Sequence, residues 1–252
     1  MVKKLFQYIG FFFLLCLSLG GHAATTPESQ FKEARQVYDK GDFAQAISLY
    51  QGLIQEGIHS GYLYYNLGNS YYRTQAWGEA KAAYLAARSE LPRNGDIQAN
   101  LTLVHQKSTD HLQFSRTPSP FFFWRSWGTA SEFSLLTALL AGLALLLCSL
   151  GLCIPRLHTL RTLGRFGLVG AALVGAAAGK LMQSKEIWGA VISKETAVHS
   201  APGAHNLSLF TLHEGAPLIW LQTEGDWSQI LLVEEKDVRR GWVTTNAIRV
   251  YR

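Results

Sequence analysis

Cysteine is scarce in this chain, which has three cysteines among its 252 residues. Cys16 lies in an apolar stretch near the N-terminus, and Cys148 and Cys153 lie in a second apolar run, so the polar parts of the chain contain none. This excludes a disulfide framework, a catalytic thiol and a cysteine-based zinc site from those parts. Lipidation of Cys16 is not expected either, because Leu15 stands where a lipoprotein signal has a small residue.

Acidic residues are missing from long stretches, and charged residues make up only 16% of the chain. Residues 133–185 contain five basic residues and no acidic one, residues 25–132 are neutral overall, and residues 186–252 carry a net charge of −2. The formal net charge of +5 therefore comes from the apolar segments. No nucleic-acid partner is expected, since neither polar part has the basic surface that phosphates require.

Residues 1–24 have the layout of a secretory signal peptide. Two lysines precede an almost wholly apolar stretch, and small residues then permit cleavage after Ala23 or Ala24. The alternative is an uncleaved membrane anchor. We expect an exported protein.

A 34-residue period runs through residues 27–105. Matching residues at this offset are Ala34 and Gly68, Phe43 and Trp77, Ala46 and Ala80, Tyr50 and Tyr84, Leu53 and Ala87, and Asn66-Leu67 and Asn100-Leu101. This period is typical of tetratricopeptide repeats, in which helix pairs stack into a solenoid. The small residues let two helices approach closely, and the aromatic residues fill the space between pairs.

Residues 25–110 are therefore predicted to form an all-α tetratricopeptide-repeat solenoid. The expected helices are 27–40, 43–56, 60–74, 77–90 and 94–107, the last of which caps the stack. Two and a half repeats make a small solenoid, so we expect contacts from neighbouring parts of the chain to stabilise it.

Solenoids of this kind bind peptides on their concave face. The resemblance to tetratricopeptide repeats implies a peptide-binding groove, which consists of Arg35, Tyr38, Tyr62, Tyr65, Asn66, Asn69, Tyr72 and Arg73. The alternative is that several of these tyrosines only pack between helices. A clamp for a C-terminal carboxylate is doubtful, because Phe31 and Ala99 stand where the basic residues of such a clamp would be.

Two apolar segments in the middle of the chain predict a transmembrane hairpin of two helices. Residues 133–154 contain no charge and span about 33 Å as a helix, enough to cross the hydrocarbon core. Residues 164–183 form a weaker span, whose terminal basic residues can snorkel. The linker, residues 111–132, contains an aromatic cluster at 121–127, which is either an interfacial belt or a cluster packed on the solenoid.

The second span has small residues four apart at Ala171, Gly175 and Gly179, which favour tight helix packing. The loop between the spans, residues 155–163, is basic, and short basic loops lie in the cytoplasm. The polar domains on either side are then periplasmic, at the inner membrane. No ionisable pair lies deep in either span, which argues against an ion or proton pathway.

Residues 187–252 are predicted to form an all-β domain. The expected strands are 190–192, 197–199, 209–212, 217–222, 227–232, 241–244 and 248–251, and turn residues separate them. The segments 197–202, 212–215, 225–227 and 241–243 resemble the bacterial SH3-like barrel. Trp227 and Trp242 are expected in its core.

The order of signal peptide, short tetratricopeptide solenoid, two spans and SH3-like domain, together with the segment Leu63–Arg73, resembles the BatE-type proteins of the bacterial aerotolerance (Bat) family. This resemblance implies a scaffold in the inner membrane that acts in envelope stress. It implies as partners other Bat proteins with von Willebrand A domains and a MoxR-type ATPase, besides membrane lipid.

Two other classes of function remain open. SH3-like domains often contact peptidoglycan, so a cell-wall binding or sensing protein is the alternative. An enzyme is not expected, because the sequence has no glycine-rich phosphate loop and no recognisable Ser/His/Asp arrangement. His199, His205 and His213 have irregular spacing without carboxylate support, so neither a metal nor another cofactor is predicted.

Overall fold

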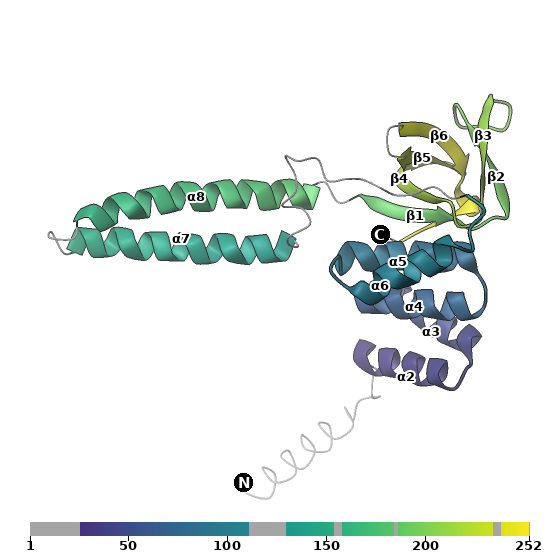
Figure 1. The fold of residues 1–252 in the computed structure, drawn as a ribbon, viewed down its shortest axis with the longest axis horizontal. Helices are drawn as coiled ribbons and strands as arrows, with labels where there is room; N and C mark the ends of the chain where they lie inside the picture. Colours follow the sequence, from purple (N-terminus) through teal and green to yellow (C-terminus); the bar gives the residue numbers. More distant parts are fainter. Residues whose placement is uncertain (1–25, 111–129, 154–157, 184–185, 234–237, 252) are drawn as a thin grey trace, which may run out of the picture. The chain divides into compact units, whose positions relative to one another are not determined.

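The computed structural model describes residues 26–110, 130–153, 158–183, 186–233 and 238–251 (Figure 1). Within these ranges, seven helices precede a C-terminal antiparallel sheet of seven strands. The predicted signal peptide and most of the predicted linker lie outside the described residues. The chain divides into two compact units, Met1–Ile58 and His59–Arg252.

The first unit contains a pair of helices, α2 (Pro27–Asp39) and α3 (Phe43–Gln55). The hydroxyl of Thr26 caps α2 by accepting a hydrogen bond of 3.2 Å from the amide of Ser29. Between the helices, Gly41 has a φ of +88°, a left-handed conformation that glycine adopts without strain. Both helices lie within one residue of their predicted ends.

Three helices begin the second unit: α4 (Gly61–Arg73), α5 (Trp77–Glu90) and α6 (Gly95–His105). Ser60 and Asn94 cap α4 and α6 with their side-chain oxygens. A Cβ atom on Gly68 would lie 2.7 Å from the ring of Tyr84, so this contact between α4 and α5 requires glycine. Gly68 thus lets the two helices of a pair approach closely, as the sequence predicted. The rings of Tyr84 and Trp77 pack against α4 of their own pair, whereas the sequence analysis expected them between pairs.

Helix α5 is buried on almost every side. Its buried residues are Gly78, Ala80, Lys81, Ala82, Ala83, Tyr84, Leu85, Ala86 and Ala87. It packs against α4, against α6, and against two strands of the sheet, β1 (Ile187–Val191) and β7 (Ile248–Val250). Alanine suits this position because its small side chain lets these four neighbouring elements approach one helix.

Helices α7 (Ala130–Cys153) and α8 (His158–Gln183) pack against each other as a hairpin (Figure 1). Helix α8 begins at His158, so residues 158–163, which the sequence analysis assigned to the loop, are helical. The predicted loop was too long, because we expected α8 to begin only after the basic residues, whereas part of this basic stretch is helical.

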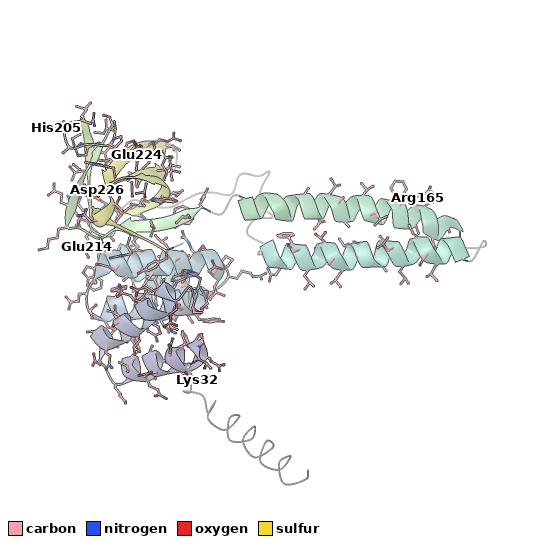
Figure 2. All side chains as sticks on the ribbon, turned by 180° about the vertical axis from the view of Figure 1, so that it is seen from behind. Lys32, Arg165, His205, Glu214, Glu224 and Asp226 are labelled. Carbon is pink, nitrogen blue, oxygen red and sulfur yellow. The ribbon has the colours of Figure 1, made fainter. Side chains whose placement is uncertain are left out.

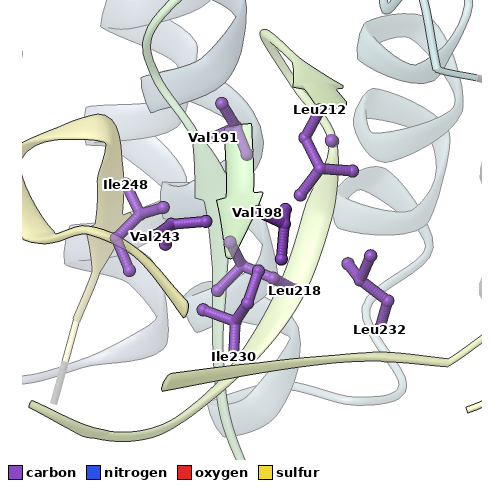
Figure 3. Close-up of a cluster of buried hydrophobic side chains, with 9 residues drawn as sticks. Val191, Val198, Leu212, Leu218, Ile230, Leu232, Val243 and Ile248 are labelled. Carbon is purple, nitrogen blue, oxygen red and sulfur yellow. The ribbon is translucent and has the colours of Figure 1, made fainter. Parts of the chain in front are cut away.

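The remaining strands are β2 (Glu195–His199), β3 (Ser208–His213), β4 (Pro217–Glu224), β5 (Trp227–Val233) and β6 (Val238–Thr244). The order in the sheet is β3-β2-β6-β5-β4-β1-β7, and all the neighbouring pairs are antiparallel. Every strand that the sequence predicted is present, usually one to three residues longer. The core of the sheet is aliphatic (Figure 3) and includes Val191, Val198, Leu212, Leu218, Ile230, Leu232, Val243 and Ile248.

The sheet does not close on itself among the described strands, whereas the sequence analysis expected a barrel. Strand β3 is one edge, and a register shift between Val198 and His199 interrupts its pairing with β2. At the other end of β3, the amide of His213 donates to the carboxylate of Asp110 over 2.7 Å. An irregular, capped edge strand of this kind resists pairing with a further strand.

Candidate functional site

Six of the eight predicted groove residues share one face of α4 in the second unit. They are Tyr62, Tyr65, Asn66, Asn69, Tyr72 and Arg73, and none of them is fully buried. Tyr62 exposes 60% of its surface, whereas Leu63, next to it, exposes 1%. The helix therefore separates a buried apolar face from an accessible face of aromatic and polar side chains, which we call the α4 face.

Part of the α4 face is engaged in packing. The side-chain oxygen of Asn69 accepts from the hydroxyl of Tyr84 at 2.8 Å and from the amide of Asn100 at 2.9 Å. These bonds tie α4 to α5 and α6, so Asn69 has a structural role. Asn66 is only partly buried, so its side-chain amide is accessible to a ligand.

The tyrosines also differ from one another. The ring of Tyr65 lies 6.1 Å from that of Tyr84, and the ring of Tyr72 lies 5.2 Å from that of Trp77. Both are partly buried by these contacts, as the packing alternative requires, while Tyr62 is exposed. The most accessible members of the α4 face are Tyr62 and Arg73.

The two other predicted groove residues belong to α2 in the first unit. Arg35 is exposed, and the ring of Tyr38 lies 5.2 Å from that of Phe43. The alternative interpretation of packing between helices thus applies to Tyr38 as well.

The start of α5 is joined to the sheet by very close contacts. The amide of Gly78 donates to the carboxylate of Glu214 over 3.1 Å, and Figure 2 shows Glu214 beside the helices. A Cβ atom on Gly78 would collide with the carbonyl oxygen of Val191 and lie 2.8 Å from the Cα atom of Ile192. The backbones touch, so the helices and the sheet form one body at this point.

A buried polar cluster lies beside this contact. The ammonium group of Lys81, whose side chain is almost fully buried, donates to the hydroxyl of Ser108 over 3.4 Å. Two residues later, Asp110 binds both the amide and the ring Nδ1 of His213, at 2.7 and 2.9 Å. We call Gly78, Lys81, Ser108, Asp110, His213 and Glu214 the junction cluster.

Burial dominates the electrostatics of the junction cluster. Desolvation lowers the pKa of Lys81 to about 8, and the negative charge of Asp110 opposes this shift. Desolvation also raises the pKa of the neighbouring Glu79, with a further contribution from the charge of Glu214. Sequence reasoning missed this cluster, because its members lie up to 136 residues apart and only the position of Lys81 in an alanine-rich helix is unusual.

The hairpin exposes large apolar side chains along both helices. Among the described residues, only Glu132–Gly151 is long and apolar enough to cross a membrane, and almost none of it is buried. The apolar stretch of α8, Thr162–Ala177, is shorter. The apolar part of the weaker predicted span is thus shorter than a segment that crosses a membrane.

Small residues line the contact between α7 and α8, although not all of those predicted. A Cβ atom on Gly175 would lie 3.2 Å from Thr137, and Ala171 is buried. A Cβ atom on Gly179 would meet no described atom within 4 Å, so its predicted packing role is not seen. The tightest position is Gly164, where a Cβ atom would lie 2.7 Å from the carbonyl oxygen of Ala144.

The described residues contain no group of three or more His, Cys, Asp or Glu side chains that could hold a metal ion. The three histidines of the sheet have other surroundings. His199 lies against the ring of Trp227, with 5.1 Å between centroids, and His213 belongs to the junction cluster. His205 lies in the exposed β2–β3 turn (Figure 2).

Comparison with known proteins adds no family to this description. No protein-family model matches the chain, and a search of curated proteins gives no match either. The function must therefore be argued from the residues and their geometry.

Proposed function

We propose that the protein is a non-enzymatic scaffold, anchored in the bacterial inner membrane, which binds an extended segment of a partner protein on the α4 face. In this proposal α2–α6 are a short tetratricopeptide-repeat solenoid, α7 and α8 are a transmembrane hairpin, and the sheet is an SH3-like domain. The accessible aromatic and polar face of α4, opposite a fully buried apolar face, carries the proposal.

Recognition on this face needs side chains that combine apolar area with hydrogen bonding. Tyr62 offers an exposed ring and hydroxyl, and Asn66, one turn later, offers an amide that can pair with a peptide backbone. Arg73 adds positive charge at the end of the same face. A peptide with an apolar residue and an acidic residue fits this combination.

Rigidity of the binding face favours affinity, because less conformational entropy is lost on binding. Helix α4 is held by α5, and α5 is held in turn by the sheet through the junction cluster. The β domain in this proposal stiffens the solenoid, which has too few repeats to be stable alone.

Lipid is the proposed surrounding of the hairpin. Leu135, Leu139, Phe166 and Leu173 each expose more than half of their surface, and such side chains are stable when acyl chains cover them. The length of α7, 24 residues or about 36 Å, suits a bilayer. With the basic turn in the cytoplasm, the solenoid and the sheet are periplasmic.

The proposed partners are other membrane proteins of a Bat-type envelope stress complex with von Willebrand A domains, and a MoxR-type ATPase. Peptidoglycan binding by the β domain is the alternative. It has less support, because Trp242 is buried in the sheet and Trp227 packs on His199.

A paired substitution tests the proposal. Tyr62→Ala with Asn66→Ala should reduce crosslinking to membrane partners in intact cells by about tenfold, while the helical content of the purified chain is unchanged. Gln45→Ala with Gln55→Ala, which changes two exposed residues of α3, is the matched control. Undiminished crosslinking by the first variant would exclude the α4 face as the binding surface.

A further inference from the structure

A pocket lies where α4 and α5 meet strands β1 and β7, away from the α4 face and the junction cluster. Its volume is about 350 Å³. It is lined by His59, Tyr64, Ala86, Ser89, Glu90, Glu186, Ile187, Trp188 and Tyr251. This volume is at the lower end of the range for sites that bind small organic groups.

Among the described residues, the lining combines aromatic rings with two carboxylates and contains no lysine or arginine. Tyr64, Trp188 and Tyr251 supply the rings, and the rings of Tyr64 and Tyr251 lie 5.2 Å apart. Glu90 and Glu186 supply the charges. Electron-rich ring faces and carboxylates both attract cations, so the pocket favours a positively charged ligand.

The polar groups of the pocket are held in place. His59 Nδ1 and the hydroxyl of Tyr64 are hydrogen-bonded at 2.6 Å. Burial and the charge of Glu90 raise the pKa of Tyr64 to about 12, so its hydroxyl stays neutral at physiological pH. Both glutamates make other contacts too, and a carboxylate has enough lone pairs to accept a further hydrogen bond.

One cation of the chain already lies next to this pocket. The guanidinium carbon of Arg88 lies 5.5 Å from the centre of the Trp188 ring, which shows that this ring accommodates a cation. The charged side chains among the described lining residues are the two carboxylates, so this part of the lining is negative. A compact ammonium group needs less space than a second planar guanidinium beside a ring that Arg88 already contacts.

We propose that this pocket binds a primary ammonium group on an unbranched aliphatic stem, as in the lysine side chain of a partner polypeptide. The stem packs against Ile187, Trp188 and Tyr251, and the ammonium group donates to Glu90 and Glu186. The pocket is thus a second recognition point that does not depend on the α4 face.

Fluorine NMR on the full chain in phospholipid nanodiscs tests this directly. The chain is labelled with 5-fluorotryptophan, and the Trp188 signal is assigned with a Trp188→Phe variant. The probe is n-pentylammonium chloride, titrated at constant ionic strength, and 1-pentanol is the uncharged probe with the same stem. We expect a saturable shift of the Trp188 signal with n-pentylammonium, and binding about tenfold weaker for 1-pentanol.

Substitutions complete the test. Glu90→Gln with Glu186→Gln should weaken n-pentylammonium binding by about tenfold, and Glu195→Gln, an exposed acid on β2, should have no effect. The other tryptophan signals report whether each variant keeps its fold. Equal binding of 1-pentanol, an unchanged affinity in the double variant, or no shift of the Trp188 signal would each overturn the proposal.

Discussion

Gly78→Ala is the sharpest perturbation of the contact between α5 and the sheet. The added methyl group would collide with the carbonyl oxygen of Val191 and lie 2.8 Å from the Cα atom of Ile192. Both are backbone atoms, so the collision cannot be relieved by a side-chain rotation. Helix α5 and the β1–β2 turn must move apart, which also stretches the 3.1 Å hydrogen bond from Gly78 to Glu214.

The size of the effect follows from opposing contributions. Overpacking costs about 1–3 kcal/mol, and the weakened hydrogen bond costs about 1 kcal/mol. Alanine in place of glycine favours the helix by up to about 1 kcal/mol. We therefore expect Gly78→Ala to lower the free energy of unfolding by about 1–3 kcal/mol.

Chemical denaturation of the full chain measures this change. Hydrogen exchange should also be faster at the amides of Gly215 and Val191, which donate to the carbonyl oxygens of Val191 and Ala216. Gly52→Ala is the matched control. Gly52 lies inside α3 with no described atom within 4 Å of the new methyl group, so the same substitution should stabilise the protein there by about 1 kcal/mol. Equal effects of the two substitutions would refute the close contact of α5 with the sheet.

The other predictions concern the buried polar groups and the hairpin. Because burial lowers the pKa of Lys81 to about 8 from 10.5, the unfolded chain binds more protons between these values, and stability should rise with pH by up to about 3 kcal/mol across this window. Lys81→Met should remove that rise, and denaturation at pH 7, 8, 9 and 10 compares the two proteins; parallel pH profiles would contradict the assignment. Asn69→Ala should cost about 1–3 kcal/mol in urea denaturation, because the hydroxyl of Tyr84 loses its acceptor, and a neutral result would mean that the bond contributes nothing. Gly164→Leu should separate α7 from α8 and increase protease sensitivity in membranes, whereas Gly179→Leu should not; similar sensitivity of both variants would reject the observed packing.

The elements of this fold follow closely from local sequence signals. The 34-residue period predicted the helices α2–α6, and the small residue that it placed at Gly68 is required where α4 meets α5. Turn residues such as Gly215 and Gly225, both with positive φ, separate the strands at the expected places. Helix and strand ends were therefore predictable to within a few residues, except that α8 begins at His158 and not at the predicted 164.

The contacts between elements were not predictable in the same way. Helix α5 carries Glu79, Lys81 and Arg88, so its sequence suggests an exposed side, yet the sheet covers it. The pocket joins residues from His59 to Tyr251, and no spacing in the sequence brings these together. The edge strand β3 of the open sheet is capped at His213 by Asp110, a residue that follows helix α6.

Contacts between elements also limited the prediction of the peptide-binding groove. Sequence position alone places Tyr62 and Asn69 on one face of α4. Only the neighbouring helices show that Tyr62 is exposed while Asn69 holds Tyr84 and Asn100.

Site-directed photo-crosslinking at Tyr62 tests the central claim most directly. A photoreactive phenylalanine analogue at this exposed position, in the full chain in intact cells, should give one discrete protein adduct. The same analogue at Glu224, exposed in the β4–β5 turn, should not give that adduct, and Asn66→Ala should diminish it. Absence of an adduct at Tyr62, or an identical adduct at both positions, would contradict partner binding on the α4 face.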